Sequence, residues 1–334
     1  MIVIGGEALV DLVDGNGSLR PVAGGGPFNT AIALGCLEVP VAFLGSISRD
    51  TYGQMLTERL VESGVDISLV RRSDAPTARA LVRRHLDGDN EYSFEVEGTS
   101  LTDLSPRDLP TLPEDAWALH VGTLSLAIDP PADAYEALVH REAQRRQIIL
   151  DPNVRPVIFG EVATYRRRFE RLVQVADVVK LSEADAAWIY PRFRIDEVIE
   201  LILGFGPRVI AVTRGKNGAV AASSGAFVDV AGVPVTVVDT IGAGDTFGAA
   251  FIAALVDEAA FGPQASRPID EPVLRRAVAY AVAASAITCT RTGAVPPSKS
   301  EIQALLSAPS PTQFAAGSVD VAVSMEPTDL GGTS

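Results

Sequence analysis

The sequence predicts an α/β fold, a three-layer α/β/α sandwich around a mostly parallel central sheet, with a small β-sheet lid. Three observations carry this prediction. Short apolar runs alternate with longer segments of helical period along most of the 334 residues, a pattern typical of a parallel sheet covered by helices on both faces. Two segments near the N-terminus break this alternation and resemble β-hairpins. A hydrophobic content of 47% is enough to form a large core.

The central sheet is expected from a series of apolar runs of strand length. They occupy residues 2–4, 41–44, 117–121, 148–150, 177–181, 209–213, 219–222 and 235–238. Segments of helical period separate most of these runs. They occupy residues 28–37, 52–63, 132–146, 164–175, 196–204, 243–259 and 273–290. Because strands and helices alternate, we expect the strands to run parallel, with helices packed on both faces of the sheet.

Two hairpins are expected to form the lid. The first spans about residues 9–23 and contains an Asp-Gly-Asn-Gly turn, and the second spans about residues 76–98 and contains an Asp-Gly-Asp-Asn turn. Alternation in the second return strand places Tyr92, Phe94 and Val96 on one face. We expect an accessory sheet that closes over a site, although two hairpins that merely extend the main sheet would give the same pattern.

The chain is expected to hold one large domain and a tail. Residues 1–307 carry the alternating pattern and form the predicted domain. Residues 308–334 are rich in Ala, Ser, Pro, Gly and Thr, so we expect a low-complexity tail with little core of its own. No run of 18 apolar residues is present and the N-terminus lacks a basic segment with a cleavage site. We therefore expect a cytoplasmic protein with no membrane partner.

Charge argues against a nucleic-acid partner. The chain carries 28 Lys and Arg against 42 Asp and Glu, a net charge of −14, and so acidic a protein is repelled by a phosphate backbone. Its three lysines are Lys180, Lys216 and Lys299, and none of them occurs in the glycine pattern of a phosphate-binding P-loop. Any phosphate chemistry must therefore rely on backbone amides, arginines or a metal ion.

The segment DTIGAGDTF at residues 239–247 carries the clearest chemical signal. It follows the expected strand at 235–238 and opens a long apolar helix. Gly242, Ala243 and Gly244 can expose N–H groups at the helix N-terminus, where the helix dipole attracts an anion. Asp245 lies in the same turn, where the dipole favours its ionised form, and can act as a general base. These features suit phosphoryl transfer to a hydroxyl, although a tight turn followed by a first-turn acid would use the same residues.

This segment resembles the C-terminal signature of the ribokinase/PfkB family of carbohydrate kinases. The stretch GGGPFNTA at residues 24–31, followed by Asp-Thr-Tyr-Gly at 50–53, resembles that family's other signature. The two signatures occur in the expected order, and the resemblance covers about residues 2–306. It implies ATP as the phosphoryl donor and a small sugar as the acceptor. It also implies Asp245 as the catalytic base and the backbone of residues 242–244 as the anion hole.

The resemblance implies further contacts with the sugar. Asp11 matches the acid that binds sugar hydroxyls, and Gly25, Gly26 and Asn29 match positions where the family contacts the sugar. The chemistry of these residues agrees, because a carboxylate accepts two hydroxyl hydrogens and glycine lets the backbone approach a polyol closely. A solvated hairpin position remains the alternative for Asp11.

Two more substrate contacts are expected from outside these signatures. Arg155 ends the stretch DPNVR at residues 151–155, which resembles the corresponding loop of fructokinase-like members of the family. This loop follows a predicted strand, and ligands collect at the carboxyl ends of strands in α/β sheets. A surface ion pair is the alternative for Arg155. Phe94, on the apolar face of the lid, is the other expected contact.

The resemblance also implies a nucleotide site and two metal sites. Lys180 and Glu183 stand where the family often has Asn-x-x-Glu, so we expect Glu183 to bind Mg²⁺ through water and Lys180 to face a phosphate. A monovalent-cation site, with K⁺ as the candidate ion, is expected at Asp239, the Ile241 carbonyl and the loop around Gly293. The stretch TRGKNG at 213–218 resembles the nucleotide segment. Its expected ATP contacts are Thr213, Gly215, Lys216 and Gly218.

These expectations describe an ATP-dependent kinase that phosphorylates a primary hydroxyl of a small sugar. Fructose is favoured because DPNVR, HVGTLSL at residues 120–126 and KLSE at 180–183 resemble fructokinases most. Ribose, another ketose, a sugar acid or a nucleoside is the alternative acceptor. A catalytically silent sugar- or nucleotide-binding regulator is the alternative of a different class, and the intact base and anion hole argue against it. The apolar lid face with Tyr92 and Phe94 could pair with a second copy and form a homodimer through the lid, but the sequence does not give the oligomeric state.

Overall fold

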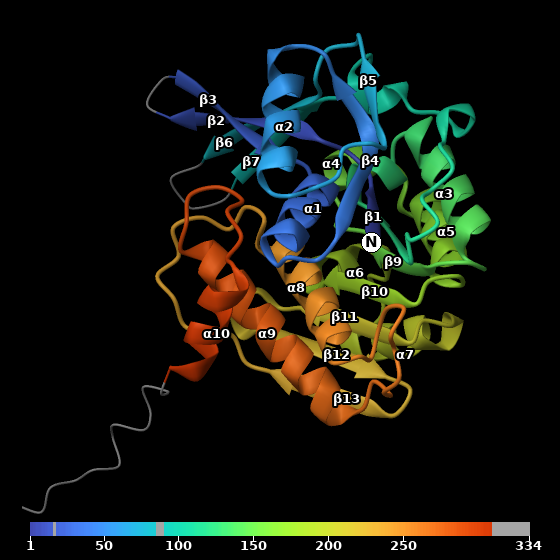
Figure 1. Ribbon diagram of the computed structural model, residues 1–334, viewed down its shortest axis with the longest axis vertical. Coiled ribbons are helices and arrows are strands. Elements are labelled where there is room, and N and C mark those ends of the chain that lie inside the picture. The colour runs from blue at the N-terminus through green and yellow to red at the C-terminus, as the bar shows by residue number, and fades with distance from the viewer. Residues whose placement is uncertain (16–17, 85–89, 309–334) are drawn as a thin grey trace, which may run out of the picture.

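A nine-stranded sheet forms the centre of the molecule (Figure 1). The computed structural model describes residues 1–15, 18–84 and 90–308. The strand order is β13-β12-β11-β10-β9-β8-β1-β4-β5, and all neighbours from β11 to β5 pair in parallel, whereas β12 and β13 are antiparallel at one edge. The strands are β1 (Ile2–Gly5), β4 (Val41–Ser48), β5 (Val70–Ser73), β8 (Ala118–Gly122), β9 (Gln147–Asp151), β10 (Val178–Ser182), β11 (Val209–Thr213), β12 (Ala219–Ser223) and β13 (Ala226–Val230).

Helices cover both faces of this sheet, which confirms the predicted sandwich. Alternation along β1 sends Ile2 and Ile4 into one core and Val3 into the other. The first core is closed by α1 (Gly26–Cys36), α2 (Thr51–Glu62), α8 (Ala243–Asp257), α9 (Glu271–Cys289) and α10 (Lys299–Ser307). The second is closed by α3 (Pro131–Glu142), α4 (Pro156–Phe159), α5 (Val162–Val173), α6 (Glu183–Ile189) and α7 (Ile195–Phe205). Short 3₁₀ turns occupy η1 (Ser100–Asp103), η2 (Pro106–Asp108), η3 (Thr123–Leu126) and η4 (Gly215–Asn217).

The strand order reverses at β1. The chain first moves outward from β1 to β4 and β5, then returns to the other side of β1 with β8 and continues outward to β13. The connections that leave the carboxyl ends of β1 and β8 therefore diverge and open a crevice between them. Residues that directly follow these strands, such as Glu7 and Thr123, are consequently placed at the point where α/β proteins bind ligands.

The predicted lid is a separate four-stranded sheet in the order β3-β2-β6-β7. Its first hairpin is β2 (Leu9–Gly15) with β3 (Ser18–Gly24), and its second is β6 (Arg79–Arg84) with β7 (Asn90–Glu95). Parallel pairing of β2 with β6 joins the two hairpins, so they do not extend the central sheet. Figure 1 shows this small sheet projecting from the body beside α1 and α2. Parts of both turns lie outside the described residues, as does the side chain of Tyr92.

One predicted strand is wrong. The valine-rich run at residues 235–238 was expected to lead into α8 as a strand, but it forms irregular backbone. Val237 and Val238 are 58% and 54% exposed, and the Val238 N–H donates to the Cys289 carbonyl rather than to a neighbouring strand. The β-branched side chains gave the run its strand signal, but β13 is the edge strand and the run pairs with no sheet.

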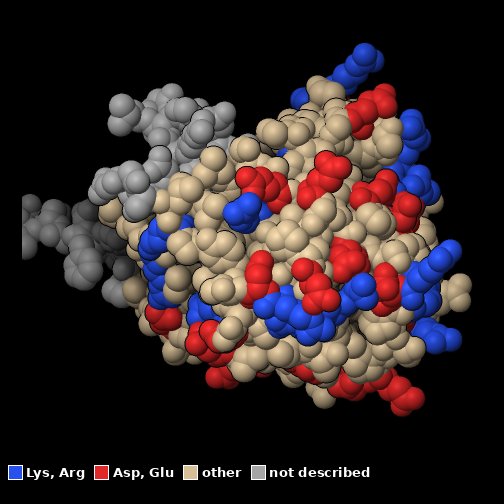
Figure 2. All heavy atoms as spheres, turned by 90° about the horizontal axis from the view of Figure 1, so that it is seen from above, with Lys and Arg blue, Asp and Glu red and all other residues tan. Residues whose placement is uncertain are grey.

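The predicted C-terminal tail lies outside the described residues apart from Ala308. The last described helix, α10, ends at Ser307. No helix within the described part of the chain is long and apolar enough to cross a membrane. On the face seen in Figure 2, acidic and basic side chains are interspersed and form no continuous basic area.

Candidate active site

The N-terminus of α8 is the centre of the site. Gly242 has a left-handed backbone, with φ of +75°, and a Cβ there would lie 2.5 Å from the Cβ of Ala294, so glycine is required. Helical geometry begins at Ala243, which leaves the first N–H groups without partners inside the helix. The Ala243 N–H makes only a long bond of 3.3 Å to the Thr240 carbonyl. These N–H groups lie at the positive end of the helix dipole, where an anion could bind.

Asp245 is buried in the first turn of this helix. Its side chain accepts a hydrogen bond from Asn29 Nδ2 at 2.8 Å and another from Asn153 Nδ2 at 3.2 Å. Burial raises the pKa of Asp245, and the Asn29 hydrogen bond, Lys180 and Arg155 act in the opposite direction. The helix dipole, from which ionisation of Asp245 was expected, also lowers the pKa. Burial makes Asp245 a stronger proton acceptor than an exposed aspartate when it is ionised.

A cavity of about 250 Å³ opens at Asp245 on the side of the lid. All six predicted sugar contacts line it, although they come from β2, the start of α1, β7 and the loop after β9. They are Asp11, Gly25, Gly26, Asn29, Phe94 and Arg155. Its other lining residues are Glu7, Leu9, Thr123, Leu124, Asn153, Thr240, Ile241, Gly242, Gly244 and Asp245. The size and polarity of this cavity suit a monosaccharide.

Asp11 lies on β2 of the lid and is 8% exposed. Burial raises its pKa to about 7, while Arg155 lowers it and the carboxylates of Asp245 and Asp239 raise it further. A Cβ at Gly24 on the paired strand would lie 2.3 Å from Asp11 Oδ2. The solvated hairpin position considered for Asp11 is therefore wrong, and glycine at position 24 makes room for this carboxylate.

Glu7 is a buried acid in the same cavity that the sequence analysis missed. Its carboxylate accepts hydrogen bonds from Thr123 Oγ1 at 2.5 Å, from Ser125 Oγ at 2.7 Å and from Ser125 N at 3.1 Å. Burial raises its pKa, and these hydrogen bonds act in the opposite direction. Glu7 thus ties the end of β1 to η3 after β8 and fixes the floor of the crevice. Its place directly after the first strand was the available signal.

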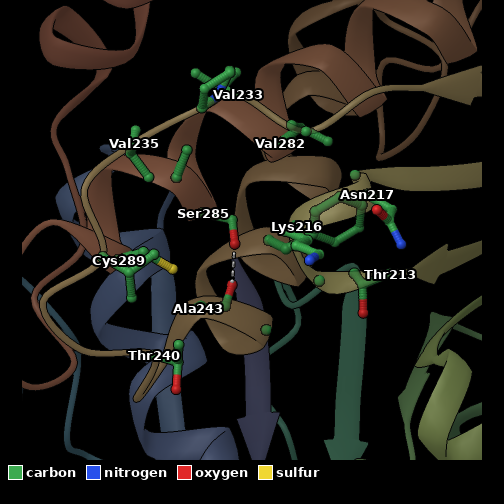
Figure 3. A pocket seen from close by; sticks show the side chains of 18 residues that line it. Thr213, Lys216, Asn217, Val233, Val235, Thr240, Ala243, Val282, Ser285 and Cys289 are labelled. Atoms are coloured by element: carbon green, nitrogen blue, oxygen red, sulfur yellow. Dashed lines mark hydrogen bonds between the residues drawn. The ribbon is translucent and has the colours of Figure 1, made fainter.

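A second cavity, of about 550 Å³, lies on the other side of the α8 N-terminus (Figure 3). Four of the expected nucleotide contacts line it, namely Thr213, Gly215, Lys216 and Gly218. The rest of its wall is largely apolar and was not predicted. It consists of Asn217, Gly232, Val233, Pro234, Val235, Val237, Thr240, Ala243, Gly244, Phe247, Val282, Ser285, Ala286 and Cys289. Figure 3 shows Ser285 of α9 bonded to the Ala243 carbonyl, at 3.0 Å, so this wall also supports the start of α8.

The structure places Lys180 and Glu183 differently from the other predicted nucleotide contacts, because neither lines this cavity. Lys180 is buried, and its Nζ donates to Asp151 Oδ2 at 2.9 Å. A Cβ on Gly244 would lie 3.3 Å from this Nζ, so the ammonium lies directly beside the start of α8. Burial lowers the pKa of Lys180, but Asp151, Asp185 and Asp245 outweigh it and the pKa is raised. Glu183 is exposed at the start of α6.

The predicted monovalent-cation residues converge. Asp239 is 8% exposed and accepts the Ile241 N–H at 3.2 Å and the Gly293 N–H at 3.1 Å. The loops after residues 238 and 290 are thereby joined beside the anion hole. A monovalent cation is bound by oxygen ligands, and Asp239 supplies a carboxylate at this place. No group of three or more His, Cys, Asp or Glu side chains forms a metal cluster in the described part of the chain.

The two cavities meet at α8. Thr240 and Gly244 line both of them, and Asp245 faces the smaller one. A hydroxyl group in the smaller cavity and a phosphate chain in the larger one could therefore approach each other across the helix N-terminus. This arrangement suits transfer of a phosphoryl group from a nucleotide to an alcohol.

Comparisons with known proteins agree with this geometry. The family model of the pfkB family carbohydrate kinases matches residues 6–301. A fructokinase from Rhizobium leguminosarum bv. trifolii is 38% identical over 280 residues, which cover 82% of this chain and 86% of the relative. The crystal structure of a Vibrio cholerae fructokinase with fructose, ADP and calcium has a TM-score of 0.80 at 26% identity, and covers 91% of this chain and 98% of its own. The ATP-bound fructokinase of Xylella fastidiosa has a TM-score of 0.81 at 26% identity, with coverage of 91% and 97%.

The chain therefore belongs to the PfkB family of carbohydrate kinases. It has the ribokinase-like α/β fold, with a large, mostly parallel sheet between helices and a small separate sheet. It is an ATP-dependent sugar phosphotransferase.

Proposed function

We propose that this kinase transfers the γ-phosphoryl group of ATP to a primary hydroxyl of fructose. The observation that carries the proposal is the meeting of a small polar cavity and a larger, largely apolar cavity at the α8 N-terminus, with Asp245 at the junction. The choice of fructose rests on the relatives. The Rhizobium relative is a fructokinase, and the Vibrio cholerae fructokinase was crystallised with fructose and ADP.

In the proposed reaction Asp245 is the general base. The sugar lies in the smaller cavity with its hydroxyls bound by Asp11, Asn29 and Arg155, so that one primary hydroxyl donates to an Asp245 oxygen. As this hydroxyl oxygen attacks the γ-phosphorus, its proton passes to the carboxylate and the bond to the β-phosphate oxygen breaks. General-base assistance and alignment of the two reactants supply much of the rate enhancement.

Charge on the transferred group is stabilised by the anion hole of residues 242–244 and by the dipole of α8. Ser285 holds the Ala243 carbonyl and so keeps these N–H groups aimed at the phosphoryl group. Lys180, beside Gly244, adds a positive charge below the anion hole without lining the cavity itself.

Metal ions complete this proposal. Mg²⁺ would be held mainly by the ATP phosphates and by water, because the described residues offer no acidic cluster, and Glu183 is the side chain proposed to contact its water shell. It would neutralise charge on the β- and γ-phosphates. Asp239, Ile241 and Gly293 are proposed to hold K⁺ beside the anion hole, where the ion would steady the loop that precedes α8.

The lid is proposed to close over the bound sugar. Asp11 and Phe94 both belong to the lid sheet and both line the sugar cavity, so closure would bring a hydroxyl acceptor and an apolar cover together. Exclusion of water matters because water competes with the sugar as an acceptor. We also propose that the lid is the contact surface of a homodimer.

The experiment is a screen for ADP release with ATP, Mg²⁺ and one acceptor at a time. Fructose, ribose, glucose, tagatose, 2-keto-3-deoxygluconate and adenosine are compared, with the Asp245→Asn variant as the background control. We expect fructose to give the highest kcat/KM. A higher value with another acceptor would replace fructose as the substrate. If no acceptor raised ADP release above that of the variant, the kinase proposal itself would fail in favour of a silent binding protein.

A further inference from the structure

The loop between β9 and α4 contains a residue with an unusual backbone. Asn153 has φ of +36°, in the left-handed region that few residues other than glycine adopt, and it lines the sugar cavity. This region is disfavoured for residues with a Cβ, although Asn adopts it more readily than most, and a residue stays there where its surroundings hold it in place. The contacts of this loop explain how it is held.

Two buried contacts fix the loop from both ends. At its start Asp151 is bonded to Lys180 Nζ at 2.9 Å, with both side chains almost inaccessible to solvent. Further along, the Val154 N–H donates to Asp185 Oδ1 at 2.7 Å. Asp185 is itself anchored, because it accepts from the N–H and the hydroxyl of Ser182. The backbone around Asn153 is therefore rigidly placed between β9, β10 and α6.

Arg155 then fixes the direction of the Asn153 amide. Its Nη1 donates to Asn153 Oδ1 at 2.7 Å and to the Asn153 carbonyl at 3.1 Å. A guanidinium group can only donate, so the amide atom that it contacts must be the oxygen. The NH₂ group of Asn153 consequently faces away from Arg155, and its Nδ2 lies 3.2 Å from Asp245 Oδ1.

The Asp245 carboxylate thus receives one amide donor on each oxygen. Asn29 donates to Oδ2 from α1, and Asn153 donates to Oδ1 from the loop after β9. A carboxylate oxygen has two lone pairs, so each oxygen can still accept a hydroxyl hydrogen. Donation to both oxygens favours the ionised form and fixes the plane of the carboxylate.

We propose that Asn153, oriented by Arg155, is a positioning residue that keeps the Asp245 carboxylate ionised and aimed at the hydroxyl of the sugar. This inference rests on the proposed function, because it takes Asp245 as the proton acceptor. It gives a role to Asn153, which lies in the DPNVR stretch but was not among the expected site residues, and it gives Arg155 a second task besides contact with substrate.

The charged groups that face Asp245 make the amide donors necessary. Lys180 from β10 and Arg155 favour the ionised carboxylate, whereas Asp151 from β9 and Asp11 from the lid oppose it. Burial raises the pKa of Asp245 above its usual range. Loss of the Asn153 donor therefore raises this pKa further, since a hydrogen bond to the charged form is removed.

The test uses Asn153→Gly, because glycine adopts the left-handed backbone freely and only the side chain is lost. The measured quantity is the rate of the first turnover between pH 5 and 9, with fructose and ATP saturating. We expect the acid limb of the profile to move to higher pH by about one unit, the size expected for one hydrogen bond to a charged group. Because a donor to the buried Asp245 carboxylate is lost, we expect the Tm at pH 8 to be lower than that of the unchanged protein.

Glu38→Gly is the matched control. Glu38 has φ of +57°, is exposed and lies beyond the C-terminus of α1, opposite the end that carries Asn29. Glu38→Gly should leave the pH profile unchanged, because the side chain that it removes is exposed. Asn153→Asp is the second variant. It keeps the shape of the side chain but replaces the donor by a like charge, so its acid limb should move further than that of Asn153→Gly.

The outcomes separate this inference from the proposed function. If Asn153→Gly raised the KM for fructose while the acid limb stayed in place, Asn153 would be a sugar contact and the positioning role would be wrong. An unmoved limb in Asn153→Asp would overturn it equally. If Asp245→Asn kept nearly the full rate, the proposed function would fail first, whatever the two Asn153 variants did.

Discussion

The two cavities that meet at α8 differ in the kind of residue that lines them. The smaller cavity is lined by side chains that carry charge or amide groups, among them Glu7, Asp11 and Asn29, which are buried and held by hydrogen bonds or by packing. The larger cavity is lined mainly by apolar side chains, valines among them, and by glycine backbone. A sugar offers many directional hydroxyls, whereas a nucleotide offers a flat base and a phosphate chain. The first site therefore depends on particular side chains, and the second depends on shape and on the helix dipole.

This difference explains how an acidic protein with three lysines can bind ATP. Lys216 lines the larger cavity, Lys180 lies buried beside the anion hole, and neither occupies a P-loop. In the proposed reaction, the backbone N–H groups of residues 242–244 and a Mg²⁺ ion would supply the remaining attraction for phosphate. Substitutions in the smaller cavity should therefore have large effects on kcat or KM, and substitutions in the larger cavity should have small ones.

The largest effect is expected for Asp245→Asn. The amide cannot accept the proton, so kcat should fall about 10³-fold, within the range for loss of a general base. Fructose and ATP should still bind with dissociation constants close to those of the unchanged protein, because Asn has the same shape. Turnover assays and calorimetric titrations measure the two quantities. A loss of fructose binding that matched the loss of rate would make Asp245 a binding residue.

Asp11→Asn should have the next largest effect. The charge-assisted hydrogen bonds to sugar hydroxyls are lost, which should raise the KM for fructose about 10-fold to 100-fold at pH 8. Because burial raises the pKa of Asp11 to about 7, the unchanged protein should bind fructose less well as the pH falls below 7. The variant has no carboxylate at position 11, so this part of the pH dependence of fructose affinity should be absent.

The same substitution should stabilise the folded protein without ligand. An acid whose pKa is raised by folding binds protons more tightly in the folded state, so its contribution to the free energy of unfolding decreases as the pH rises from about 4 to 7. At pH 8 Asp11→Asn should therefore have a higher Tm than the unchanged protein, and at pH 4 the gain should be smaller. Equal gains at both pH values would contradict the burial argument.

The smallest effect on kinetics is expected for Val235→Ala, in the wall of the larger cavity. Val235 is half-buried and only two methyl groups are removed, so the KM for ATP should rise no more than about fivefold, with kcat and the KM for fructose unchanged. A change as large as that of Asp11→Asn would remove the proposed asymmetry between the two cavities.

The sequence was sufficient to predict the sandwich, the separate lid and six of the residues that line the smaller cavity. Local patterns carry this information, because strand period, turn residues and the two glycine-rich signatures are contiguous in the chain. The resemblance then indicated that Asp11, Asn29 and Arg155 belong with Asp245, which spacing alone could not show.

Contacts between distant segments could not be predicted in this way. The bond between Asn153 and Asp245 spans 92 residues, and that between Glu7 and Ser125 spans 118. Neither leaves a local pattern. The run at 235–238 shows the opposite error, a local pattern that predicts a strand where none forms. Its β-branched residues favour a strand, but the run lies beyond the edge strand β13. Val235 and Val237 line the larger cavity instead. Strand propensity is a property of the residue alone, whereas tertiary contacts decide whether a segment becomes a strand.

Phosphorus NMR of the reaction with fructose tests the central claim most directly. Transfer to a primary hydroxyl places two hydrogens on the carbon next to the ester oxygen, so the product signal should be a triplet in a proton-coupled spectrum and should grow as the ATP γ-phosphate signal decays. The Asp245→Asn variant should leave the ATP signal intact over the same time. A doublet from a secondary ester, or inorganic phosphate alone, would contradict the account.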